Sequence, residues 1–117
     1  MCVKTNDQKN PAIYQNIVVW EEDVWIIYGD IYAYNISNST EFQIRTEGRA
    51  QSSPAIYGDL VVWIDDRDRK MDIYGYNLHT REEFPIYAGN RWQHSPQVYR
   101  NIVVWTESAN IYGYKIL

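Results

Sequence analysis

The most regular feature of the sequence is a run of apolar residues that ends in tryptophan and occurs three times. The run reads NIVVW at residues 16–20, DLVVW at 59–63 and NIVVW at 101–105, at intervals of about 42 residues. Its apolar positions are consecutive and do not alternate with polar ones, which is typical of a β-strand covered on both faces. We therefore expect three copies of one structural unit, each built around a buried strand.

A shorter apolar segment precedes each central run and predicts a first strand in every repeat. A glutamine and a proline open the segment, and proline favours an extended conformation in the residue before it. Two residues, often Asn, Asp or Gly, then separate the segment from the central run, as in a tight hairpin turn. The predicted first strands are residues 12–14, 55–57 and 97–99, and the predicted turns are 15–16, 58–59 and 100–101.

A third and a fourth strand are predicted after the central run. The third has the pattern Ile-Tyr-X-Tyr, where X is Ala or Gly, and a polar loop of variable length precedes it. The fourth contains Pro85 in its second copy, and a proline cannot donate to a strand ladder, so this strand should lie at an edge. The predicted third strands are 31–34, 73–76 and 111–114, the fourth strands 41–46 and 82–87, and the loops 21–30, 64–72 and 106–110.

Four antiparallel strands per repeat, in a sheet covered on both faces, predict an all-β chain made of β-propeller blades. No stretch carries the apolar stripe of a helix, so an α/β fold is excluded. We expect residues 1–117 to form one propeller unit. Within it, residues 11–53 form blade one, 54–95 form blade two, 96–117 supply the first three strands of blade three, and 1–10 hold an outer strand.

This division predicts assembly into a homodimer. Three blades close poorly into a ring, and propellers typically have 4–8 blades, so two chains would give a six-bladed ring. The segment Val3, Lys4, Thr5, Asn6 parallels residues 44–47, where the predicted fourth strand of blade one ends. We expect it to pair with the third strand of blade three in the partner chain, formed by Ile111, Tyr112, Gly113 and Tyr114. The alternatives are another ring size or a fragment of one longer propeller.

Charge and composition exclude several classes of partner. The net charge is −4 with no basic run, which disfavours nucleic acid. No apolar run approaches about 18 residues, so membrane insertion is not expected. The single cysteine, Cys2, excludes an intrachain disulfide framework. The N-terminal residues lack the apolar stretch of a signal peptide, which predicts a cytoplasmic protein unless the chain is a fragment of an exported surface protein.

Residues 53–80 carry the most specific motif. They read SPAIYGDLVVW, then DDRD at 65–68 and DIYGYNL at 72–78. This pattern resembles the TolB-type propeller repeat, and more closely the variant found in archaeal surface-layer propellers. The resemblance implies a six- or seven-bladed propeller that binds or displays, with no common catalytic residues. Blade three departs from the pattern, because its loop at 106–110 is short and lacks the Asp-Arg-Asp segment.

Candidate ligand residues gather at the rim that should carry the longer loops. Trp25 and Trp92 lie outside the repeat register and could be platforms for a sugar ring or an apolar side chain, or could simply pack locally. The glutamine that recurs at positions 8, 51 and 93 could form a ring of ligand donors, although bracing of the backbone is favoured. The candidate ligand-binding residues are Trp25, Trp92, Gln51, Gln93, His94 and Arg91.

Other polar clusters predict neither a metal site nor catalysis. The acids at 65, 66, 68 and 72 lack the order of a calcium loop, and basic residues interleave with them, so a solvated, salt-bridged turn is expected. His94 adjoins Ser95, but no nucleophile motif is present. No cofactor is predicted. The expected function is a non-catalytic module for protein interaction or surface display; the alternatives are lectin-like binding of a glycan or small molecule and, more remotely, an enzyme site at the subunit junction.

Overall fold

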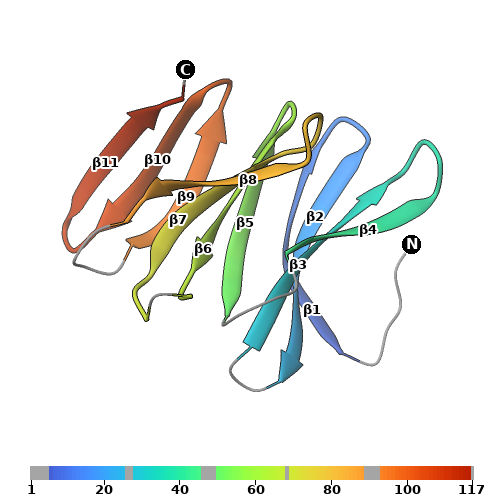
Figure 1. Ribbon diagram of the computed structural model, residues 1–117, viewed down its shortest axis with the longest axis horizontal. Helices are drawn as coiled ribbons and strands as arrows, with labels where there is room; N and C mark the ends of the chain where they lie inside the picture. Colours follow the sequence, from blue (N-terminus) through green and yellow to red (C-terminus); the bar gives the residue numbers. More distant parts are fainter. Residues whose placement is uncertain (1–5, 26–27, 46–49, 68, 89–92, 117) are drawn as a thin grey trace.

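The computed structural model describes residues 6–25, 28–45, 50–67, 69–88 and 93–116, and of residues 24, 25, 28 and 45 the backbone alone (Figure 1). These residues contain eleven β-strands and no helix. The strands are β1 (Asp7–Tyr14), β2 (Ile17–Trp25), β3 (Tyr28–Asn35), β4 (Thr40–Arg45), β5 (Gln51–Tyr57), β6 (Leu60–Asp65), β7 (Asp72–Asn77), β8 (Glu82–Tyr87), β9 (Gln93–Tyr99), β10 (Ile102–Glu107) and β11 (Asn110–Lys115).

The strands form three antiparallel sheets that correspond to the three predicted blades. The order is β1-β2-β3-β4 in blade one, β5-β6-β7-β8 in blade two and β9-β10-β11 in blade three. Figure 1 shows the sheets fanned out side by side, and β5, the first strand of blade two, contacts both β1 and β9. The predicted all-β propeller fold is confirmed, and Pro85 lies in the edge strand β8 as expected.

The pairing register is the same in all three blades. Each central strand contains a Val-Val pair. Its first valine lies opposite one residue of the first strand and opposite the second tyrosine of the third strand. These triplets are Ile13–Val18–Tyr34, Ile56–Val61–Tyr76 and Val98–Val103–Tyr114. Residues at the same position of the sequence repeat therefore occupy the same position in each blade.

The residue before each proline differs from expectation. Asn10, Ser53 and Ser95 have φ values of 53°, 53° and 51°, in the left-handed region, where an extended conformation was expected. Each lies at a β-bulge in the first strand, and a bulge accommodates its extra residue by such a φ. The strand continues on the N-terminal side of the bulge, so residues 7–9 pair with β2 in blade one and are not part of an outer strand.

The polar segment 21–30 was expected to be a loop, and this expectation is wrong for most of its length. Strand β2 continues to Trp25 and β3 begins at Tyr28, so the two strands form a long hairpin. The extension is stabilised by acids of β2 that find partners on β1: Lys9 Nζ lies 2.8 Å from an oxygen of Asp23, and Gln8 donates to Glu22 at 3.1 Å. The pattern of polar residues indicated exposure, whereas cross-strand pairing decided the structure.

Two apolar clusters fill the junctions between adjacent blades. The first contains Val19, Ile31, Ala33, Ile44, Ile56, Val61 and Trp63, and the second contains Ala55, Val62, Ile64, Ile73, Val103 and Trp105. Trp63 and Trp105 are thus buried between blades, as predicted. Trp20 is also buried but belongs to neither cluster, and its ring stacks on Tyr32 at a centroid distance of 6.2 Å.

Replacing Trp63 by alanine should lower the free energy of unfolding by roughly 3–5 kcal/mol, because it empties the centre of the first junction. Urea unfolding followed by circular dichroism, at one protein concentration, measures the change. Ile36→Ala is the control, since this isoleucine is exposed in a turn, and it should change stability by less than about 0.5 kcal/mol. A loss below about 1 kcal/mol for Trp63→Ala would contradict the predicted role of this residue.

Candidate functional site

The blades present two rims of different character (Figure 1). The loop rim, at the bottom of the figure, carries the start of β1 and the connections β2–β3, β6–β7 and β10–β11. The turn rim, at the top, carries the two-residue turns at 15–16, 58–59 and 100–101 and the turns at 36–39 and 78–81. A site on either rim draws side chains from adjacent blades.

On the loop rim, each blade carries a row of three polar residues across its first three strands. The rows are Gln8–Glu22–Asp30, Gln51–Asp65–Asp72 and Gln93–Glu107–Asn110. The signal in the sequence is the recurring glutamine together with an acid two residues after each central tryptophan. The recurring glutamines therefore occupy aligned positions in three adjacent blades.

Two of the three glutamines lie inside the protein, and Gln8 is half-buried. Gln51 and Gln93 are fully buried, and Gln8 donates its amide hydrogen to Glu22, where bracing of the backbone was expected. Neither side-chain atom of Gln93 that can form hydrogen bonds has a partner among the described residues, although its backbone nitrogen donates to Met71 of blade two at 3.1 Å. Gln51 and Gln93 are thus placed to support the junctions and do not present their amides to solvent.

Asp65 is the centre of a buried network in blade two. Its carboxylate accepts the indole hydrogen of Trp63 at 3.0 Å and both side-chain hydrogen bonds of a bidentate Arg67 guanidinium, at 2.9 and 2.7 Å. The guanidinium also bonds Glu83 and lies over the ring of Tyr74, 3.7 Å from its centroid. Burial alone would lower the pKa of Arg67, but the hydrogen bonds to Asp65 and Glu83 outweigh it and raise that pKa. The turn is salt-bridged as predicted, but Asp65 and Asp72 are buried where solvated acids were expected.

Glu21 ties blade one to blade two on the same rim. Its carboxylate accepts the Asn10 amide at 2.9 Å and the backbone N–H of Ser53 at 3.1 Å. The backbones approach closely here, since a Cβ added to Gly29 would lie 2.7 Å from the carbonyl oxygen of Gln51. These contacts close the loop rim at the junction between blades one and two.

The remaining predicted residues are distributed as follows. His94 is exposed in β9, and its carbonyl accepts the Thr106 hydroxyl at 3.2 Å. The backbone of Trp25 pairs with Tyr28, while its side chain, like Arg91 and Trp92, lies outside the described part of the chain. The same holds for Val3, Lys4 and Thr5, whereas Asn6 forms a bend before β1. Every residue of β11, including Ile111, Tyr112, Gly113 and Tyr114, is exposed.

Two further findings concern chemistry within the described residues. No group of three or more His, Cys, Asp or Glu side chains there is placed to hold a metal ion. That part of the chain also contains no helix with the length and apolar character needed to cross a membrane.

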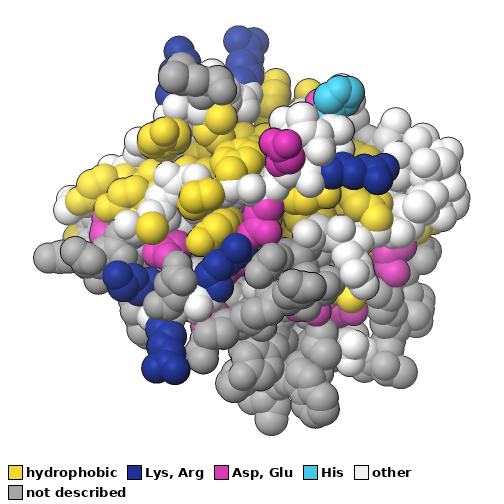
Figure 2. Space-filling view, in the orientation of Figure 1, with side chains coloured by type: hydrophobic (Ala, Val, Ile, Leu, Met, Phe, Trp, Pro, Cys, Tyr) yellow, Lys and Arg dark blue, Asp and Glu magenta, His cyan; other side chains and the backbone are white. Residues whose placement is uncertain are grey.

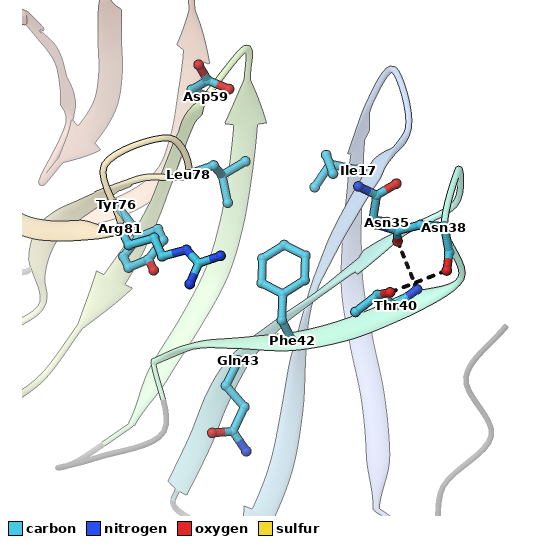
Figure 3. A pocket seen from close by; sticks show the side chains of 10 residues that line it. All are labelled: Ile17, Asn35, Asn38, Thr40, Phe42, Gln43, Asp59, Tyr76, Leu78 and Arg81. Carbon is cyan, nitrogen blue, oxygen red and sulfur yellow. Dashed lines mark hydrogen bonds between the residues drawn. The ribbon is translucent and has the colours of Figure 1, made fainter.

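The turn rim carries a groove at each of the two junctions. The first, of about 440 Å³, lies between β4 of blade one and the β7–β8 turn of blade two, with Phe42 at its centre (Figure 3). The second, of about 420 Å³, lies between blades two and three. Sequence reasoning missed these grooves, although Asn35 and Phe42 recur as Asn77 and Phe84 at the same repeat positions.

Replacing Asp65 by alanine should cost about 3 kcal/mol of unfolding free energy, because it leaves the Arg67 cation partly buried without its main partner. The double variant Asp65→Ala/Arg67→Met should be more stable than the sum of the two single losses predicts, since it removes the orphaned charge. Urea unfolding of all three variants measures this, with the exposed Glu82→Ala as the control. Strictly additive losses would show that the two side chains are not coupled.

No family model matches the chain, and a search of the curated proteins gave no match. Among solved structures, the chain is similar to a TolB from Agrobacterium tumefaciens, with a TM-score of 0.67 and 16% identity over 80% of this chain and 35% of that one. It is also similar to the tricorn protease, with a TM-score of 0.70 and 16% identity over 90% of this chain and 11% of that one. A third similar structure is the β-propeller domain of the Trilobed protease from Pyrococcus furiosus, with a TM-score of 0.70 and 13% identity over 90% of this chain and 35% of that one.

The chain thus spans about a third of the TolB and Trilobed protease structures and a smaller part of the tricorn protease. At this low identity the likeness concerns the fold alone. Together with the three sheets and their common register, it shows that the chain is built of β-propeller blades.

Proposed function

We propose that the chain is a non-catalytic β-propeller module that closes its ring with a second copy of itself and serves in protein interaction or surface display. The observation that carries this proposal is the outer face of blade three. Ile111 is 79% exposed there, while Ile31 and Ile73, at the same repeat position in blades one and two, are fully buried. Figure 2 shows hydrophobic side chains gathered over the region of β9, β10 and β11.

The two outward faces of the blade array carry the same residue positions as the two sides of an internal junction. The face of blade one that carries Ile13 corresponds to the face of blade two that carries Ile56, which packs into the first junction. Ile13 is 62% exposed, whereas Ile56 is 8% exposed. Blade three of one chain placed against blade one of another would therefore repeat the internal junction and bury both exposed isoleucines.

A row of tyrosines supports the same arrangement. Tyr14, Tyr57 and Tyr99 end the first strands of the three blades, with ring centroids 4.6 and 4.9 Å apart across the two junctions. Tyr99, at the end of the row, is 59% exposed. The Tyr14 of a second copy would continue this row across the new junction, so ring closure extends an existing contact.

Strand exchange completes the proposal. In the described residues β11 is an edge strand with an apolar, exposed surface, and such edges are normally covered or paired. We propose that the segment from Val3 to Asn6 pairs with the partner's β11, which is supported by its sequence parallel to residues 44–47, the stretch in which β4 ends. The resemblance to surface-layer propellers supports a display role.

Two features support a non-catalytic role. His79 is exposed in the β7–β8 turn, where its backbone nitrogen donates to Asn77, and His94 is exposed in β9. Neither histidine side chain has a hydrogen-bond partner among the described residues that would place it as a catalytic base.

Light scattering on the purified chain should give twice the chain mass of 13.9 kDa. Ile111→Lys places a charge in the proposed interface and should shift the protein to the monomer mass, because an unpaired charge is costly to bury. Deleting residues 1–6 should weaken the dimer in the same direction by unpairing β11 of the partner.

Ile36→Lys is the matched control, since Ile36 is an exposed isoleucine in the β3–β4 turn, away from both outward faces; it should leave the dimer intact. A wild-type chain that stays monomeric at micromolar concentration would contradict the proposal. So would a mass that grows continuously with concentration, because that behaviour indicates an open chain of copies.

A further inference from the structure

We propose that the two grooves of the turn rim are binding subsites for a neutral oligosaccharide, with one sugar unit seated against a phenylalanine at each blade junction. This site is independent of ring closure, because both grooves lie between blades of one chain. It also lies on the rim opposite the one where the sequence placed the candidate ligand residues.

The first groove combines an aromatic platform with polar groups on both sides. Phe42 of β4 is half-buried on the apolar core of the junction, and its ring stands between Leu78 and Arg81 of blade two and Ile17 and Asn35 of blade one (Figure 3). The volume of about 440 Å³ lies in the range typical of small-molecule sites. An aromatic ring with one accessible face can stack on the apolar face of a pyranose.

The asparagines of the grooves are held in place by their own turns. The Asn35 side-chain oxygen accepts hydrogen bonds from the backbone nitrogen of Ser37 at 2.9 Å and from its hydroxyl at 2.6 Å. The Asn77 oxygen accepts from the backbone nitrogens of His79 at 2.8 Å and Thr80 at 3.1 Å. Each amide is therefore oriented before any ligand binds, and its NH₂ group remains available to donate within the groove.

The charged groups of the first groove favour a ligand whose groups both donate and accept. The guanidinium of Arg81 is donor-only, and the carboxylate of Asp59 is acceptor-only. Both residues are exposed, and neither makes an ion pair with another described side chain. Different hydroxyls of one polyol can accept from Arg81 and donate to Asp59, whereas an anionic ligand would meet the Asp59 charge. The near-neutral balance of the groove thus selects a neutral polyol over a uronate or an acidic peptide.

The second groove repeats this chemistry with different residues. Phe84 takes the place of Phe42, Asn77 that of Asn35, and Arg100 supplies the guanidinium, while Asp59 also lines this groove. Arg100 comes from the β9–β10 turn and Arg81 from the β7–β8 turn, so the two cations reach equivalent grooves from different positions. Two like subsites at successive junctions fit a repeating chain better than a single compact ligand, because a linear ligand that spans both gains by avidity.

Titration of the whole chain with three neutral hexasaccharides, cellohexaose, chitohexaose and maltohexaose, tests the proposal by amide NMR and calorimetry. At least one should bind saturably at millimolar concentration and shift the side-chain NH₂ signals of Asn35 and Asn77. The galacturonic acid hexamer is the acidic counterpart and should bind more weakly than the best neutral chain.

Three variants locate the binding. Phe42→Leu keeps an apolar side chain but removes the ring, and it should lower the affinity roughly tenfold, which circular dichroism can separate from unfolding. Arg81→Gln should lower the affinity about fivefold, the effect of losing one exposed hydrogen bond. Lys70→Gln removes an exposed cation from the loop rim and should change nothing.

Absence of saturable binding by all three neutral hexasaccharides would overturn the proposal. Wild-type affinity in folded Phe42→Leu, or shifts confined to the loop rim, would overturn the assigned site. Stronger binding of the galacturonic acid hexamer would overturn the neutral ligand class. None of these results depends on whether the chain is a dimer, so they are separable from the test of assembly.

Discussion

The structure depends on the burial of one strand on both of its faces. In blade two both faces are covered: Val61 packs into the first cluster and Val62 into the second, and both are fully buried. In blade one Val19 is fully buried against blade two, whereas Val18, on the other face, is half-buried. In blade three the two faces of the central strand differ in burial, since Val103 is fully buried while Val104 is 38% exposed. A blade with such a strand cannot complete its core alone, because each face of the strand needs another sheet against it. The repeat supplies that sheet at the two internal junctions, and a covering partner would supply it at the outward faces.

The features that could be predicted from the sequence are those that depend on local pattern. The two-residue turns at 15–16, 58–59 and 100–101 follow from turn chemistry, and the burial of Trp63 follows from the consecutive apolar run that it ends. The bulges and the long β2–β3 hairpin could not be predicted in this way. The φ of Asn10 is set by how β1 pairs with β2, and the extension of β2 past Trp20 depends on partners about fourteen residues away on another strand, such as Gln8 for Glu22.

The candidate site shows the same division between local and non-local information. The recurrence of glutamine placed a polar row on the loop rim, where the structure has it. The burial of Gln51 and Gln93 could not be predicted, because it depends on how the next blade packs over them and not on the pattern within one repeat. The grooves were missed for a related reason. Phe42 comes from one repeat and Arg81 from the next, and their proximity appears only when the blades are set side by side.

The two rims satisfy their polar groups in different ways, and this difference separates stability from binding. On the loop rim, carboxylates such as Asp65 and Glu21 are buried and saturated by protein donors, so a loss there is a loss of folding energy. On the turn rim, Arg81 and Asp59 are exposed, water can satisfy them, and a ligand can replace that water at little cost to the fold.

The junction formed with a second copy would not carry a third groove equal to the two within the chain. Lys115 stands there at the position of Asn35 and Asn77, and a mobile cation would replace an amide held by its own turn.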